Sequence, residues 1–252
     1  MYSAVNTARS AISSILTLSN SNNDFGSHKL VSRFMKGLYN VRPSLPRYSA
    51  IWDPDTVLTY LYRLHPRRKL SLKLLTLKVT MLLALLTGQR VQTLHLIKLE
   101  NVSMTTEYVQ IVINSTLKTS RPSWHLDPIV FTRFNESRRL CIVRYLREYI
   151  KRTSTLRGSE THLLISFRKP HKKVTKSTIS RWLKLVLCRA GIDISIYKAH
   201  STRAASASKV CTQVPIEKIL KAGGWSGDSA FLKHYKLAPL RSDVQNAMLQ
   251  KV

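Results

Sequence analysis

Residues 71–90, SLKLLTLKVTMLLALLTGQR, hold the longest apolar segment of the chain and end in a glycine-containing turn. The spacing predicts a helix from Ser71 through Leu86 that breaks at Gly88, because glycine lets the backbone turn sharply. This break leaves Arg90 at the start of a further helical segment, residues 91–96. The stretch therefore predicts a core helix followed by an arginine at a defined turn.

Outside this stretch, apolar spacing predicts more helices than strands. Asp53 is a suitable cap for one helix, with Pro54 in its first turn. Another predicted helix has Pro215 at its start and is ended by Gly223-Gly224. Predicted helices cover residues 3–18, 27–39, 53–64, 136–152, 176–190, 201–210 and 215–221.

A small sheet is predicted in the middle of the chain. Residues 108–113 are β-branched and typical of a strand, and residues 124–131 resemble a second one. Lys118 lies between them and is therefore predicted on or near a hairpin. The predicted fold class is mainly α with a small antiparallel β-sheet.

A semi-rigid connector is predicted to divide the chain. Pro43, Pro46 and Pro54 fall within a stretch of low helical character. We therefore predict two domains, residues 1–44 and residues 45–252. Two helices are few for an independent domain, so the first part is expected to be a fragment of something larger.

Net charge is the strongest signal in the composition. The chain has 41 Lys and Arg residues against 13 Asp and Glu residues, a formal charge of +28 over 252 residues. Such a chain is expected to bind a polyanion, preferably nucleic acid, with steep salt dependence. The alternative is a basic protein at a membrane surface, but no basic amphipathic helix stands beside a lipidation signal, and the apolar runs are too short to cross a bilayer.

The cysteine content and the hydrophobic content limit which class of protein this chain can belong to. At 44% hydrophobic residues the chain can bury a real core. Cys141, Cys188 and Cys211 are odd in number and lack the paired spacing of zinc sites. We expect reduced thiols in an intracellular protein without a structural metal.

Several residues far apart in the sequence suit metal-free attack on a phosphodiester. This reaction needs cations on the non-bridging oxygens, a proton acceptor for the nucleophile and a proton donor for the leaving oxygen. Arg90 and Arg203 are the cations, His200 and Lys118 the proton-transfer groups, and Tyr235 the nucleophile. The set requires no metal or nucleotide cofactor.

These motifs resemble those of the tyrosine recombinases, the phage-integrase family, from about Trp52 to the C-terminus. Five motifs occur in the family's order, which is hard to produce by chance. Residues 117–122, 178–182 and 200–206 further resemble recombinases of eukaryotic mobile elements, including those of DIRS-like retrotransposons. The family's active-site positions fall on Arg90, Lys118, His200, Arg203, Trp225 and Tyr235.

The resemblance implies a role for each position. Tyr235 would attack the scissile phosphorus to form a 3′-phosphotyrosyl bond, while Arg90 and Arg203 hold the non-bridging oxygens. His200 would accept the tyrosine proton or hydrogen-bond the phosphate, and Lys118 would protonate the departing 5′ oxygen. Each residue also has an ordinary structural alternative as a surface cation, a structural histidine or a half-buried tyrosine.

Trp225 would donate its indole N–H to a phosphate oxygen and pack against a tyrosine-bearing helix predicted from Ala230, although packing alone is an alternative. Two departures from the family pattern stand out. Thr93 occupies a position that is acidic in many relatives, so a salt bridge to the first arginine is absent. Trp225 precedes Tyr235 by ten positions, and His234 falls at the more usual spacing.

Further basic residues are predicted to contact the DNA backbone, with a merely solvated surface as the alternative. Two lie on the helix over residues 27–39, where Leu30, Phe34 and Leu38 are expected to form the apolar face. Arg121 is also a possible substitute for Lys118. The candidates are Arg33, Lys36, Arg121, Lys169, Lys172, Lys173 and Lys176.

The resemblance implies a site-specific recombinase that cuts and rejoins double-stranded DNA. It further implies a homotetramer on two DNA sites, with residues 236–252 as a tail that docks on a neighbour, and a nuclear location. No membrane partner is expected. Two alternatives stay open: a type IB topoisomerase, which shares the chemistry but acts as a monomer, and a non-catalytic DNA-binding remnant of a mobile element, for which a damaged active site is expected.

Overall fold

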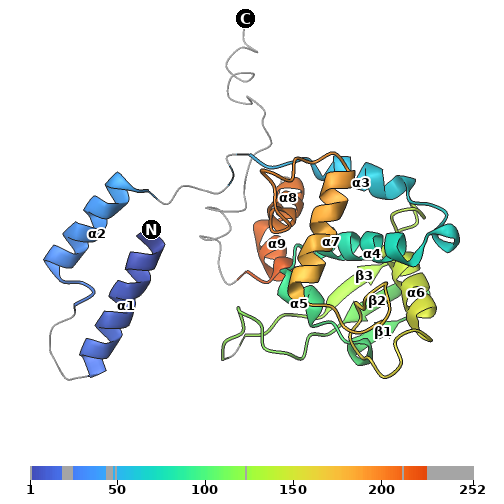
Figure 1. Ribbon diagram of the computed structural model, residues 1–252, viewed down its shortest axis with the longest axis horizontal. Helices are drawn as coiled ribbons and strands as arrows, with labels where there is room; N and C mark the ends of the chain where they lie inside the picture. Colours follow the sequence, from blue (N-terminus) through green and yellow to red (C-terminus); the bar gives the residue numbers. More distant parts are fainter. Residues whose placement is uncertain are drawn as a thin grey trace, which may run out of the picture. The chain divides into compact units, whose positions relative to one another are not determined.

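The computed structural model describes residues 2–18, 25–43, 48, 50–122, 124–211 and 213–225 (Figure 1). These residues are mainly helical, with a three-stranded antiparallel sheet, so the predicted fold class is confirmed. The chain divides into two compact units, Met1–Tyr48 and Ser49–Val252. The assignment of the first part to a DNA-binding domain stays a prediction.

The first unit contains two helices that contact each other, α1 (Tyr2–Leu18) and α2 (Lys29–Val41). The predicted apolar face of α2, formed by Leu30, Phe34 and Leu38, is not the buried face of the helix. Met35 is buried, whereas Leu30 is 69% and Phe34 is 61% exposed. Among the described residues of α2, burial is therefore confined to Met35.

The second unit contains the sheet and the remaining helices. In chain order these are α3 (Pro54–Arg63), η1 (Arg67–Lys69), α4 (Leu72–Thr87), α5 (Val91–His95), η2 (Leu99–Asn101), β1 (Val102–Met104), β2 (Tyr108–Ile111), β3 (Ile129–Thr132), α6 (Ile142–Thr153), α7 (Lys176–Arg189), α8 (Ser201–Val210) and α9 (Ile216–Gly223).

Two elements differ from their predictions, and one was missed. The helix predicted from residue 136 begins at Ile142, because residues 138–140 form a turn and Leu140 N–H donates to Ser137 O. The strand predicted over residues 124–131 is confined to Ile129–Thr132. Strand β1 is three residues long, too short for its alternation to be recognised.

The sheet has the order β1-β2-β3, with both pairs antiparallel. Ser103 pairs with Gln110 across the first ladder, and Val109 pairs with Phe131 across the second. The buried side chains Val109, Ile111 and Phe131 join the main core. The sheet thereby anchors a long β2–β3 connection, which carries Lys118.

Helix α4 lies at the centre of this unit (Figure 1). Twelve of its sixteen residues are buried, so other elements must cover it on several sides. Its neighbours are α5, α6, α7 and α8. In the view of Figure 1, α6 lies toward one edge of the unit and α8 and α9 toward the opposite edge. The C-terminal end of α4 leads into the turn that carries Arg90.

A fully buried lysine lies within α4. The Lys78 ammonium donates to the backbone oxygens of Leu61, Leu64 and Arg139 at 2.7–2.8 Å. It also lies 3.8 Å from the centre of the Tyr145 ring. Burial, and secondarily the charge of Arg139, lower the pKa of Lys78 to about 7. This side chain ties the end of α3 and the segment before α6 to the central helix.

Candidate active site

The turn before Arg90 forms as predicted. Gly88 adopts a left-handed conformation with φ 58° and caps α4, and its N–H donates to Ala84 O. A side chain at this φ would be strained, which is why glycine suits the position. Arg90 follows as the N-cap of α5 and is half-buried.

Gln89 connects this turn to the end of α9. Its Nε2 donates to Ala222 O at 2.7 Å, and its Oε1 accepts from the Thr93 hydroxyl at 3.1 Å. Gln89 and Thr93 are both buried. Thr93 therefore supports Gln89, which in turn holds the backbone beside Arg90. Gln89 was not among the predicted site residues. The sequence indicated it only as a polar side chain between Gly88 and Arg90.

Arg203 lies on α8 and is 2% exposed. Its Nη1 donates to Gly88 O at 2.6 Å and to Gly223 O at 2.7 Å. Small buried residues, Ala204 and Ala205 among them, let α8 approach α4 closely. Arg203 therefore joins the turn before Arg90 to the end of α9.

Trp225 lies against Arg203. The Arg203 guanidinium carbon lies 3.6 Å from the centre of the indole ring, a cation–π arrangement. A Cβ on Gly223 would lie 1.6 Å from the Trp225 ring, so no other residue fits there without displacing the indole. Gly224, at φ 65°, caps α9, and Trp225 N–H donates to Leu220 O at 2.9 Å. The predicted glycine-terminated end of the last helix is confirmed.

His200 is the exposed N-cap of α8, one turn ahead of Arg203. The adjacent Ser201 fixes this end of the helix. Its hydroxyl accepts from Trp52 Nε1 at 2.8 Å and donates to Lys198 O at 2.7 Å. The start of α8 is thus held to the segment before α3.

Lys118 is exposed on the β2–β3 connection, as predicted. A tight turn presents it: Leu117 N–H donates to the Ser120 hydroxyl at 2.9 Å, and Ser120 N–H donates to Leu117 O at 3.0 Å. Farther along the connection, Asp127 pairs with Lys221 of α9 at 3.1 Å. The connection is therefore attached to the same helix end as Gln89.

The structure thus brings together the turn of Arg90, the α8 residues His200 and Arg203, and Trp225. Within the described part of the chain, no hydrogen bond or ion pair joins Lys118 to them. Tyr235, with the helix expected from Ala230 and the tail over residues 236–252, lies outside the described residues. The catalytic roles stay predictions.

The predicted DNA contacts are all exposed: Arg33 and Lys36 on α2 of the first unit, and Arg121, Lys169, Lys172, Lys173 and Lys176 in the second unit. The segment before α7 is held as a narrow loop, in which Ser166 N–H donates to Lys172 O at 2.8 Å. Their contact with DNA stays a prediction.

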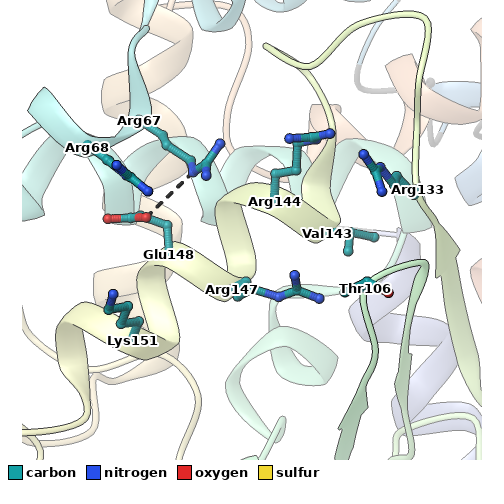
Figure 2. A pocket seen from close by; sticks show the side chains of 9 residues that line it. All are labelled: Arg67, Arg68, Thr106, Arg133, Val143, Arg144, Arg147, Glu148 and Lys151. Carbon is teal, nitrogen blue, oxygen red and sulfur yellow. Dashed lines mark ion pairs between the residues drawn. The ribbon is translucent and has the colours of Figure 1, made fainter.

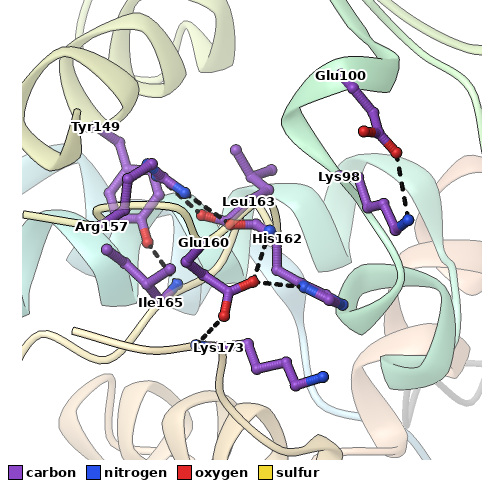
Figure 3. Close-up of polar contacts among 9 residues, drawn as sticks. All are labelled: Lys98, Glu100, Tyr149, Arg157, Glu160, His162, Leu163, Ile165 and Lys173. Carbon is purple, nitrogen blue, oxygen red and sulfur yellow. Dashed lines mark hydrogen bonds and ion pairs between the residues drawn. The ribbon is translucent and has the colours of Figure 1, made fainter. Parts of the chain in front are cut away.

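Glu160 anchors this basic loop (Figure 3). Its carboxylate accepts hydrogen bonds from the backbone N–H and ring of His162 and from the backbone N–H of Lys173. Partial burial alone would raise the pKa of Glu160, but these hydrogen bonds outweigh it and lower the pKa to about 2. The carboxylate is therefore ionised at neutral pH.

The described residues lack both a metal-binding cluster and a membrane-spanning helix. No group of three or more His, Cys, Asp or Glu side chains is placed to hold a metal ion. No described helix is long and apolar enough to span a membrane.

The fold is that of the tyrosine recombinases. XerA recombinase matches with a TM-score of 0.56 and 17% identity, over 93% of this chain and 77% of that one. A lambda integrase dimer bound to a COC′ core site matches with a TM-score of 0.55 and 16% identity, over 93% and 73%. XerH recombinase bound to its difH substrate matches with a TM-score of 0.56 and 11% identity over 80% of this chain, which spans 53% of XerH.

The model of the phage integrase family matches residues 64–238. Because this range covers more than half of the sequence, the chain belongs to the phage integrase family. No curated protein sequence matches it.

Proposed function

We propose that this protein cuts and rejoins DNA strands through a covalent bond between Tyr235 and the 3′ phosphate. The contact of Arg203 Nη1 with Gly88 O and Gly223 O carries the proposal. These two oxygens lie two residues before Arg90 and two residues before Trp225. The buried guanidinium of Arg203 thereby holds together the segments that carry Arg90 and Trp225, so three of the predicted catalytic positions lie in one region.

The proposed step is a transesterification. The Tyr235 oxygen attacks phosphorus as the bond to the 5′ oxygen breaks, with His200 accepting the tyrosine proton and Lys118 supplying a proton to the leaving oxygen. Arg90 and Arg203 stabilise the charge on the non-bridging oxygens. Reversal of the step by a different 5′ hydroxyl rejoins the strands. The phosphotyrosyl bond conserves the energy of the broken linkage, so no nucleotide cofactor is required.

DNA as the substrate is supported by the charge of +28 and by structural relatives that are DNA-bound recombinases. Assembly as a homotetramer on two sites is part of the proposal, as are a nuclear location and an origin in a DIRS-like mobile element. Dependence of strand exchange on protein concentration separates such an assembly from a monomeric topoisomerase.

The test is trapping of a covalent adduct on nicked duplexes drawn from the DNA that flanks the coding sequence. The chain is expected to form an adduct that Tyr235→Phe abolishes. Tyr108→Phe is the matched control, because Tyr108 is an exposed tyrosine on strand β2 and is not a predicted catalytic residue. Tight binding to the true site without any adduct would instead establish a non-catalytic DNA-binding protein.

A further inference from the structure

A basic pocket lies on the second unit, apart from the predicted catalytic residues (Figure 2). Its volume is about 300 Å³. Six of its nine lining residues are cations, and one is a carboxylate. The lining residues are Arg67, Arg68, Thr106, Arg133, Val143, Arg144, Arg147, Glu148 and Lys151.

Helix α6 supplies one wall of the pocket. Its opposite face, with Tyr145 and Leu146, is buried in the core. The pocket face carries Arg144, Arg147 and Lys151, spaced three and four residues apart. Like charges at these spacings lie next to each other and destabilise a helix. A bound anion would remove this repulsion.

Other elements bring further cations to α6. Arg67 and Arg68 come from η1, and Arg133 follows strand β3 (Figure 2). Arg67 pairs with Glu148 at 3.5 Å, and Arg133 pairs with Glu107 at 2.8 Å. These two carboxylates leave most of the positive charge of the pocket uncompensated.

Two buried donor atoms support an anion site. The Nε atoms of Arg133 and Arg144 are buried, and neither has a hydrogen-bond partner within the described residues. Buried polar atoms are normally satisfied, so these two guanidinium groups keep donor capacity that no described protein group uses. Planar guanidinium groups match the oxygens of phosphate, to which they donate two hydrogen bonds at once.

The pocket and the predicted active site lie on different parts of the second unit. Helix α6 contacts α4, the strand β3 and η1, whereas α8 contacts α4, α3 and α9. In Figure 1, α6 lies toward the edge of the unit opposite α8 and α9. A phosphate in the pocket therefore cannot be the phosphate that Arg203 would hold.

We propose that this pocket binds phosphate groups of the DNA backbone outside the segment that is cut. The choice of DNA as the source of phosphate rests on the proposed function. A volume of about 300 Å³ admits a short run of backbone phosphates but not a duplex, which must lie across the pocket mouth. The pocket would thus hold flanking DNA, or a second duplex, on the same protomer.

The test is the salt dependence of binding to a random-sequence duplex of about 60 base pairs, long enough for about six helical turns. The double variant Arg144→Gln and Lys151→Gln removes two pocket cations whose side chains have no hydrogen bond or ion pair in the described structure. The control Arg63→Gln and Arg189→Gln removes the same charge from the exposed last residues of α3 and α7. All chains carry Tyr235→Phe, so strand cleavage does not affect the measurement.

The pocket variant is expected to lower the slope of log affinity against log salt by about 1.8, because each phosphate contact contributes about 0.9. The control is expected to leave the slope unchanged. Equal slopes for both variants would overturn the proposal and make the pocket a solvated basic face.

A second arm uses inorganic pyrophosphate, titrated by calorimetry. Binding that the pocket variant loses and the control retains supports a phosphate site whether or not the chain cleaves DNA. If pyrophosphate binding depends on the pocket but the duplex slope does not, the ligand is a free phosphate compound and the DNA assignment is wrong. Thermal unfolding of each variant confirms that it is folded.

Discussion

Lys78 and Arg203 are both buried cations held by backbone oxygens and an aromatic ring, yet they stabilise different parts of the molecule. Lys78 donates to three oxygens and lies against Tyr145. Arg203 donates to two and lies against Trp225. The oxygens around Lys78 belong to segments without a predicted catalytic residue. Those around Arg203 belong to the turns that precede Arg90 and Trp225.

The comparison shows that one arrangement of charge serves two purposes. The hydrogen bonds of Lys78 hold α3, α4 and the segment before α6 together in the core. The hydrogen bonds of Arg203 fix the relative positions of residues that are proposed to bind one phosphate. Loss of Lys78 should therefore reduce stability without a specific effect on chemistry, whereas loss of Arg203 should lower the rate of the reaction as well as stability.

Lys78→Met is expected to give the largest effect on stability. It leaves three buried carbonyl oxygens without their donor, at a cost of about 3–5 kcal/mol in the free energy of unfolding. Denaturant unfolding measures this loss. Lys73→Met, a half-buried lysine on the same helix, is the control and should cost less than about 1 kcal/mol. Similar losses for both variants would contradict the role given to Lys78.

Arg203→Lys is expected to act on chemistry. Lysine keeps the charge but lacks the planar fork, so the rate of covalent adduct formation should fall by about 10²–10³-fold. Single-turnover trapping measures the rate, with Arg189→Lys on the exposed end of α7 as the matched control. A rate near that of the parent chain would show that Arg203 is structural, as Lys78 is.

Gly223→Ala tests the contact between Trp225 and the arginine. The new Cβ would lie 1.6 Å from the indole and must displace it, at a cost of about 1–3 kcal/mol. Tryptophan fluorescence and unfolding should both report the change. Gly37→Ala has no atom within 4 Å of its new Cβ and lies inside α2, so it should be neutral or stabilising. An unchanged indole signal in Gly223→Ala would contradict the packing described.

Glu160→Gln should have the smallest effect, because glutamine keeps one acceptor oxygen and loses only the charge of the carboxylate, and we expect a cost of about 1 kcal/mol. The pKa of Glu160 is lowered to about 2 in the folded chain, below its ordinary value of 4.5. The unfolded chain therefore binds more protons between these values, so the stabilisation is present above pH 4.5 and lost as the pH falls through 2. Between pH 6 and pH 2, the free energies of unfolding of the parent chain and of Glu160→Gln should converge. A constant difference over this range, or the same convergence for the exposed Glu136→Gln, would rule out this role.

Much of the fold could be predicted because local signals there agree with the tertiary structure. Helix α4 begins after Ser71 and ends at Gly88, as its capping residues indicated. The predicted helix over residues 201–210 is observed unchanged. Strand β1 and the apolar face of α2 could not be predicted in this way, because both depend on which neighbour covers them.

The sequence motifs predicted which residues belong to the site, but not which hydrogen bonds hold them in place. Arg90 and Trp225 were marked by short motifs that contain glycine, and Arg203 by its spacing from His200. Gln89, Ser201 and Lys78 carry no such mark, since a lone glutamine, serine or lysine is usually exposed. Their partners are distant in sequence: Lys78 meets Arg139, and Gln89 meets Ala222. Such long-range hydrogen bonds cannot be derived from spacing along the chain.

The most direct test of the central claim is the identity of the residue that becomes attached to DNA. The trapped adduct would be digested with protease and nuclease, and the modified peptide sequenced by mass spectrometry. The account predicts a single modified residue, Tyr235, bearing a 3′-phosphonucleotide. A modification on any other residue, or no adduct on the true site, would contradict it.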